Sequence, residues 1–265
     1  MNIRNKNKDL ERIKNFRLMD DDFMVVIFDG DVQTTGYVVN TVLEKSDIEI
    51  IQVTVQSEQK NLSGRSIILD VLAQDSIGKY YNIEIQRSDR GAGRHRARYH
   101  ASILDSKLLS AGDRTFLLPE TYVIFITEND VLKKGYSLYH IERIIQEDGE
   151  PFEDGEHIIY VNGAYEGNDP IGRLMNDFRV KDPNEMFSDV LKRKSKFFKE
   201  TEEGQATMCR MMEEMRRESE ANATIRVLAT LVEQKKISLS DAAQTSQMTE
   251  AEFLTRVEQQ RQESL

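Results

Sequence analysis

The sequence predicts an α/β fold: a mixed central sheet with flanking helices, followed by a helical C-terminal region. Two observations lead to this prediction. Residues 32–127 alternate helical and strand patterns in the order αβββαβ, and from Pro170 onward the chain becomes helical and charged with few glycines or prolines. A length of 265 residues allows one full core and a smaller module. We therefore expect two domains, 1–184 and 185–265.

The strands are expected where β-branched and aromatic residues gather between turn signals. These segments are residues 48–56, 66–75, 80–86, 121–127, 136–144 and 157–163. The pair 66–75 and 80–86 should form a hairpin, with a turn at 76–79, after a break at 61–64. The most apolar strand, 121–127, should be central.

Helices are expected where apolar residues recur at helical spacing. These segments are residues 32–45, 94–110, one or more helices within 185–236, and two short helices within 236–260 that are separated near Gln247. Residues 1–22 are interpreted as a polar lead-in. The long helical region is amphipathic, so its apolar side should pack on the core or on a second copy of the chain.

Composition excludes several classes of protein. Hydrophobic residues make up 39% and charged residues 31%, with no apolar run long enough to span a membrane and no apolar stretch typical of a secretory signal. The single cysteine, Cys209, excludes a disulfide framework and a cysteine-based zinc site. We therefore expect a cytoplasmic protein. No two of the four histidines have the spacing of zinc ligands.

The charge is unevenly distributed along the chain. The net charge of −10 argues against nonspecific coating of nucleic acid. Between residues 87 and 98, however, five arginines face one acid, Asp89. Such a stretch could contact the phosphates of a substrate strand. A solvated or salt-bridged start of a helix explains the same residues without any substrate, and this alternative stays open.

A group of polar residues interrupts the expected hairpin. Asp70 lies in an otherwise apolar strand, and a buried carboxylate there must be paired or bind a metal. Glu84 and Gln86 share one face of the next strand, because side chains alternate along a strand. If the hairpin brings the three together, their oxygens suit Mg²⁺ and phosphodiester hydrolysis. A hairpin edge with solvated polar residues is the alternative.

The motif formed by Asp70, Glu84 and Gln86, D-(x13)-E-x-Q in an αβββαβ order, resembles the PD-(D/E)XK nuclease superfamily. The stretch NLSGRSIILDVLAQDSIGKYYNIEIQRSD, followed by RARYH, is similar to its Rpn branch of recombination-promoting nucleases and transposase-like proteins. LMDDDFMVVIF, LPETYVIFITENDVL, YHIERI, YVNGAY and DPIGRLMNDF extend the resemblance over residues 18–200. The resemblance implies a restriction-endonuclease-like core.

The resemblance also implies an activity: Mg²⁺-dependent cleavage of DNA, associated with transposition or recombination, with Mn²⁺ as a possible substitute. Asp70 and Glu84 carry over as metal ligands and, with Gln86, as catalytic residues. Gln86 stands where the wider superfamily has lysine, which leaves activation of the water open. The implied partner is DNA, contacted by Arg87, Arg94, Arg98 and Tyr99. A catalytically silent relative that binds DNA or a protein partner is the rival interpretation.

Two further sites are interpreted as structural. His100 stands where the branch commonly has a second tyrosine, and a partly buried helix residue is favoured over a functional one. The acidic run at residues 20–22 resembles a motif of the branch. A helix cap or solvated turn is favoured there over a third metal carboxylate. For the two short C-terminal helices, a capping or self-association module is favoured over a DNA-binding helix-turn-helix, because the second helix begins with TEAE, which is poorly suited to a DNA groove.

Overall fold

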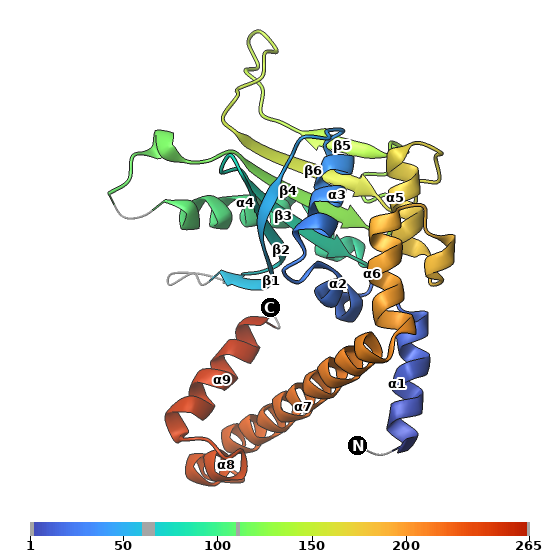
Figure 1. The fold of residues 1–265 in the computed structure, drawn as a ribbon. Helices are drawn as coiled ribbons and strands as arrows, with labels where there is room; N and C mark the ends of the chain where they lie inside the picture. Colours follow the sequence, from blue (N-terminus) through green and yellow to red (C-terminus); the bar gives the residue numbers. More distant parts are fainter. Residues whose placement is uncertain (1–2, 60–66, 110–111, 264–265) are drawn as a thin grey trace. The chain divides into compact units, whose positions relative to one another are not determined.

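The computed structural model describes residues 3–59, 67–109 and 112–263. In these residues, six strands form a single mixed sheet in the order β1-β2-β3-β4-β6-β5 (Figure 1). Its strands are β1 (Ile50–Gln59), β2 (Ile67–Asp75), β3 (Tyr80–Gln86), β4 (Thr121–Thr127), β5 (Leu138–Ile141) and β6 (Glu156–Asn162). Neighbours β1, β2 and β3 run antiparallel, β3-β4-β6 run parallel, and β5 is antiparallel to β6. The expected α/β class and hairpin are confirmed.

The centre of the sheet explains why its strands are recognisable in the sequence. All seven residues of β4 are buried, and β4 pairs in parallel with β3 on one side and β6 on the other. A strand covered on both faces consists of a continuous apolar run. The central position expected for residues 121–127 is confirmed. The apolar residues of β2 would also suit a strand buried on both faces, but Ile68 is 49% exposed, so only one face of β2 is fully covered.

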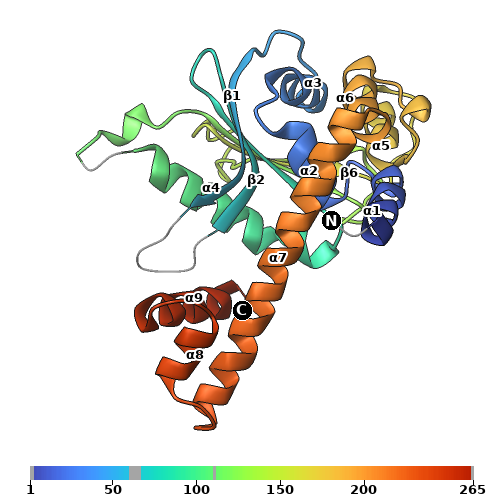
Figure 2. The ribbon, with the colours of Figure 1, turned by 60° about the horizontal axis from the view of Figure 1, so that its bottom comes forward.

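Nine helices are present in the described residues. They are α1 (Ile3–Asn15), α2 (Asp21–Phe28), α3 (Val32–Val42), α4 (Arg94–Leu108), α5 (Pro170–Arg179), α6 (Asp189–Glu200), α7 (Glu202–Glu233), α8 (Leu239–Thr245) and α9 (Glu250–Glu263). α4 packs through Ala97 and Ala101 on Val123 and Phe125 of β4. α2 and α3 lie across the sheet from α4 (Figure 2). The site described below lies where α4 covers β3.

The N-terminal segment differs from its expectation. The sequence predicts a polar lead-in over residues 1–22, but α1 and α2 occupy most of residues 3–28. Charged residues hide the helical pattern of α1, in which Ile13 is fully buried. In α2 the apolar residues Phe23 and Phe28 are buried in the core. Tertiary packing therefore stabilises helices that the local sequence signals weakly. The break expected at residues 61–64 lies outside the described residues.

Contacts divide the chain into two compact units, residues 1–205 and 206–265. α6 belongs to the first, where its Phe198 ring meets Phe23 of α2 edge to face at 6.4 Å between centroids. The division expected after residue 184 stays a prediction. In the second unit, Ile225 and Leu228 pack with Ala242, Ala243 and Phe253. The two short C-terminal helices are confirmed, with Gln247 at a φ of 58° between them.

A buried lysine connects α6 to the N-terminal segment. The Lys199 ammonium donates hydrogen bonds to the backbone carbonyls of Phe16 and Lys181, and it lies over the Phe23 ring, 5.0 Å from the centroid. Burial lowers the pKa of Lys199 to about 8. The folded state therefore gives up this proton at a lower pH than the unfolded state does.

We expect this proton to make stability depend on pH. Between pH 8 and 10.5 Lys199 holds more of its proton in the unfolded chain, so its contribution to the free energy of unfolding should rise with pH in this window. Lys199→Met should lack the rise and lose about 1–3 kcal/mol relative to wild type by pH 10. Urea unfolding at pH 7, 8, 9 and 10 measures this, with Lys196→Met as the control. Parallel profiles for wild type and Lys199→Met would contradict it.

Candidate active site

Two carboxylates lie where the β2–β3 ladder ends. The last paired residues on this side are Val71 and Ile83, so the next residues of the two strands are Asp70 and Glu84. Beyond this point, carboxylate oxygens take the place of backbone carbonyls as hydrogen-bond acceptors. Ile85 N donates to Asp70 Oδ2 at 2.9 Å, and Asp70 N donates to Glu84 Oε1 at 3.4 Å. The antiparallel register therefore brings the two acids together from positions 14 residues apart in the sequence.

The two carboxylates are largely buried. Glu84 is fully buried, and its Oε2 has no hydrogen-bond partner among the described residues. Burial and the neighbouring Glu84 charge raise the pKa of Asp70 to about 7, and Asp21 of α2 adds a smaller repulsion. Two carboxylates forced together in this way favour either a shared proton or a bound cation.

Gln86 joins this pair from the same face of β3. Its Nε2 donates to Asp70 Oδ2 at 3.3 Å. Gly91, in the short 3-10 helix Asp89–Ala92, lies against the same amide, because a Cβ at Gly91 would be 2.0 Å from Gln86 Oε1. The structure thus brings together all three residues expected at the centre of the site. Gly91, which lies just before α4 in the chain, has a contact there as well.

Two residues of α4 approach Glu84 and were not assigned to the site from the sequence. The buried His100 places Nδ1 3.3 Å from Glu84 Oε1, and Arg96 places Nη2 3.6 Å from Glu84 Oε2. His100 also touches the Phe125 ring at 6.0 Å between centroids. His100 lies on a helix as expected, but it is almost fully buried rather than partly buried. Helical spacing places Arg96 and His100 on one face, and this i, i+4 relation was the signal available in the sequence.

The four residues expected to contact DNA are differently placed. Arg94 and Arg98 are exposed on the first turns of α4, four residues apart. Tyr99 is half-buried and packs beside Ile67, Leu69 and Leu104. Arg87 follows Gln86 directly, and its Nη1 lies 3.1 Å from Asp20 Oδ1. Their contact with DNA stays a prediction.

Asp70 and Glu84 suit a divalent metal ion that takes only one or two of its ligands from the protein. Asp70 and Glu84 supply hard carboxylate oxygens, and Glu84 Oε2 is free of hydrogen bonds within the described chain. Across the described residues, no group of three or more His, Cys, Asp or Glu side chains could hold a metal. Mg²⁺ is commonly held by one or two carboxylates, with water and substrate phosphate as the other ligands. The pair therefore fits such an ion.

The order of elements and the acids at the ladder's end agree with one family. Residues 35–164 match the family model of PD-(D/E)XK nuclease family transposases. The resemblance to this superfamily is thereby confirmed. The matched PD-(D/E)XK region contains Asp70, Glu84, Gln86 and all of α4, whereas α1, α2 and all helices from α5 onward lie outside it. The comparisons found no matching curated protein and no matching solved structure.

The family also narrows the class of reaction. PD-(D/E)XK nucleases generally use divalent metal ions, and the match to this family suggests a hydrolase of the nuclease class. Within the residues that the structure describes, no helix is long and apolar enough to cross a membrane. The acidic run at residues 20–22 lies outside the matched region, with Asp20 paired to Arg17 and Arg87, and Asp22 paired to Arg12.

Proposed function

We propose that this protein is a Mg²⁺-dependent DNA endonuclease that serves transposition or recombination. One observation carries the proposal: Asp70 and Glu84 meet at the end of the β2–β3 ladder, with a buried Glu84 oxygen that has no hydrogen-bond partner among the described residues. A buried oxygen that makes no hydrogen bond costs stability. A bound cation would offset that cost, which supports a metal site over a structural pair.

The reaction is hydrolysis of a phosphodiester. Oxygen of a water attacks phosphorus, the bond to the leaving oxygen breaks, and the products are a phosphomonoester and an alcohol. When bound, the metal would polarise the phosphoryl oxygen and lower the pKa of a bound water. Asp70 and Glu84 would hold it through carboxylate oxygens. Gln86 keeps Asp70 oriented through its amide at 3.3 Å, and its own oxygen can accept a hydrogen bond from water.

His100 and Arg96 act on Glu84 in this proposal. Their nitrogens lie 3.3 and 3.6 Å from its two oxygens. Both would fix the direction of the carboxylate, and the Arg96 guanidinium would balance part of its charge before a metal binds. Deprotonation of Asp70 should accompany binding, because metal-ligating carboxylates are ionised. Affinity for Mg²⁺ should therefore increase from pH 6 to pH 8, as Asp70 loses its proton near a pKa of about 7.

The direct test is nicking of supercoiled plasmid DNA. The purified chain should convert plasmid to open circles with Mg²⁺ or Mn²⁺, and it should lose this activity in EDTA. The rival function is a catalytically silent protein that keeps the fold to bind DNA or a protein partner. DNA binding without nicking under any divalent ion would select it.

Gly91 offers a finer test of Gln86. Gly91→Ala places a methyl group where the Gln86 amide lies, so Gln86 should turn away from Asp70. We expect Gly91→Ala and Gln86→Ala each to slow nicking by about 10-fold or more, since positioning contacts of this kind contribute at least that much. The double variant should be no slower than either single variant, because both remove one contact.

Gly93→Ala is the matched control for this test. A methyl group added at Gly93 would meet its nearest neighbour, the Arg90 carbonyl oxygen, at 3.8 Å, so the substitution should leave activity unchanged. Additive losses in the double variant would show that Gly91 acts through something other than Gln86. Melting temperatures of all variants separate loss of the contact from loss of the fold.

A further inference from the structure

A recess of about 670 Å³ lies beside the candidate active site, within residues 1–205. Its lining comes from α1, α2, the end of β3, and the end of α5 with the residues after it. The lining residues are Arg12, Asn15, Phe16, Arg17, Asp20, Asp21, Asp22, Arg87, Arg179 and Lys181. Five are cationic and three acidic, in a chain whose net charge is −10. The recess is therefore a locally cationic surface on an acidic protein.

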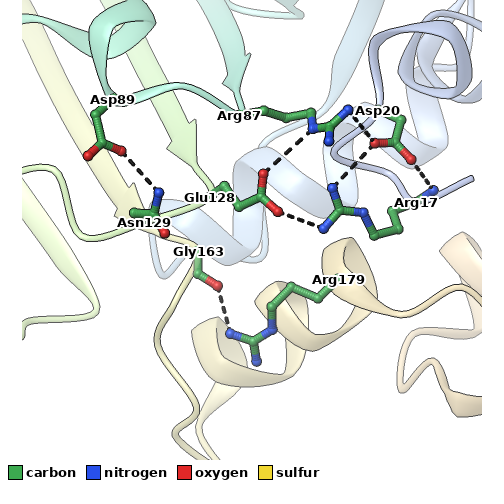
Figure 3. Close-up of polar contacts among 8 residues, drawn as sticks. All are labelled: Arg17, Asp20, Arg87, Asp89, Glu128, Asn129, Gly163 and Arg179. Carbon is green, nitrogen blue, oxygen red and sulfur yellow. Dashed lines mark hydrogen bonds and ion pairs between the residues drawn. The ribbon is translucent and has the colours of Figure 1, made fainter.

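Two arginines in the wall belong to a closed ring of ion pairs (Figure 3). Arg17 contacts Glu128 at 2.6 Å and Asp20 at 3.4 Å, and Arg87 contacts the same two acids at 3.6 and 3.1 Å. Each carboxylate thus bridges two guanidinium groups. Glu128 N also donates to the Gln86 carbonyl, so the ring is tied directly to the strand that carries the site. The ring holds both arginines in fixed positions.

Arg179 and Lys181 line the opposite wall of the recess, and neither side chain forms an ion pair with an acid among the described residues. Arg179 donates through Nη1 to the carbonyls of Gly163 and Tyr165, which leaves its Nε and Nη2 without a hydrogen bond to any described residue (Figure 3). Lys181 is exposed, and its ammonium makes no ion pair or hydrogen bond with the described residues. Anchored guanidinium groups with free donors are suited to phosphate oxygens.

We propose that this recess binds a phosphate group of a nucleic-acid strand, held by Arg179 and Lys181 and bordered by Arg17. The volume suits one nucleotide unit, since ligand pockets span about 300–1,000 Å³. Asp21 lines the recess, and its negative charge repels that of Asp70, so the recess and the carboxylate pair are neighbours. Naming the strand as the source of the phosphate rests on the proposed function, whereas anion binding itself does not.

The test measures binding without cleavage. Anisotropy of a fluorescent duplex of about 20 base pairs is followed in EDTA from about 50 to 300 mM salt. At low salt, Lys181→Ala should weaken binding of the duplex by about 3-fold. The double variant, which adds Arg179→Gln, should weaken it by about 10-fold or more. The slope of log affinity against log salt should fall by about one to two units for the double variant, since each neutralised phosphate contributes about 0.9. Arg193→Ala, an exposed cation outside the recess, should leave the slope unchanged.

Two sources of phosphate are distinguished by the duplex used. A loss that appears only with a 5′-phosphorylated duplex identifies a terminal phosphomonoester, and an equal loss on a 5′-hydroxyl duplex identifies an internal phosphodiester. Lys181→Ala removes no side-chain polar contact with a described residue, so this single variant should fold normally. It therefore tests the recess even if the variant that also carries Arg179→Gln misfolds. Unchanged affinity and slope in both variants overturn the proposal, even if the wild type nicks plasmid. Recess-dependent binding by a protein that never nicks overturns the proposed function alone.

Discussion

Asp70→Asn and Glu84→Gln should each abolish metal-dependent nicking, with a loss of at least about 1,000-fold, because each removes an anionic ligand from the metal. Both replacements keep the shape of the side chain. An asparagine at 70 can still accept the hydrogen bond that Ile85 N gives to Asp70 Oδ2. The fold should therefore survive. Rates of plasmid nicking at several Mg²⁺ concentrations measure the effect.

Asp47→Asn provides the control, because Asp47 is an exposed acid of the same unit that has no contact with the pair. It should nick plasmid at the wild-type rate. Residual activity above about 10% in Asp70→Asn would place the catalytic metal elsewhere and end the site assignment.

The same Asp70 variant should be more stable than wild type. The folded state holds the Asp70 proton up to a pKa of about 7, whereas the unfolded chain releases it near pH 4. The contribution of Asp70 to stability should therefore fall as pH rises from 4 to 7, and its full penalty is present above pH 7. Asp70→Asn avoids this penalty, so at pH 8 without metal we expect a gain of at least about 1 kcal/mol. Unfolding in urea at pH 4.5 and pH 8 tests the sign.

Truncation should give the second large effect. A fragment of residues 1–205 contains the whole sheet, the candidate site and α6, and we expect it to fold and to nick plasmid like the full chain. A fragment of residues 1–184 lacks α6 with its buried Leu191 and Phe198, and it leaves the carbonyls that bind Lys199 without a donor. Burial of each apolar side chain contributes about 1.5–3 kcal/mol. The shorter fragment should not fold, since total stability is only about 5–15 kcal/mol.

Circular dichroism and nicking rates distinguish the two fragments, and sedimentation tests self-association through residues 206–265. A stable, active 1–184 fragment would place the folding boundary where the sequence pattern predicts it. A 1–205 fragment that is monomeric while the full chain is a dimer would support the self-association expected of the C-terminal helices. If the 1–205 fragment and the full chain have the same oligomeric state, self-association through residues 206–265 is rejected.

Sequence reasoning predicts most of the sheet because its signals are local. The apolar run of β4 and the alternation in β3 are visible without any tertiary contact, and both strands have the expected bounds. The meeting of Asp70 and Glu84 follows from one hairpin register. The contacts of Glu84 with Arg96 and His100 depend on how α4 packs on the sheet, which one sequence does not specify.

Long-range pairs are the least predictable part. Arg17 and Glu128 are 111 residues apart, and nothing in either segment alone indicates a partner. α1 escapes prediction for the same reason, since its few apolar residues are meaningful only once the surfaces that cover them exist. Local patterns indicate elements, whereas the walls of a recess made from four segments require the folded chain.

The contacts of Lys199 have a consequence for synthesis of the chain. The ammonium reaches the Lys14 carbonyl across 185 residues, so α1 is made long before its partner. At roughly 5–20 residues per second, translation takes about 10–40 s to produce that partner. During this interval the side of α1 that faces α6 lacks its partner, while Arg12 of α1 can already pair with Asp22 of α2. The contacts between α1 and Lys199 therefore form only after α6 has been made.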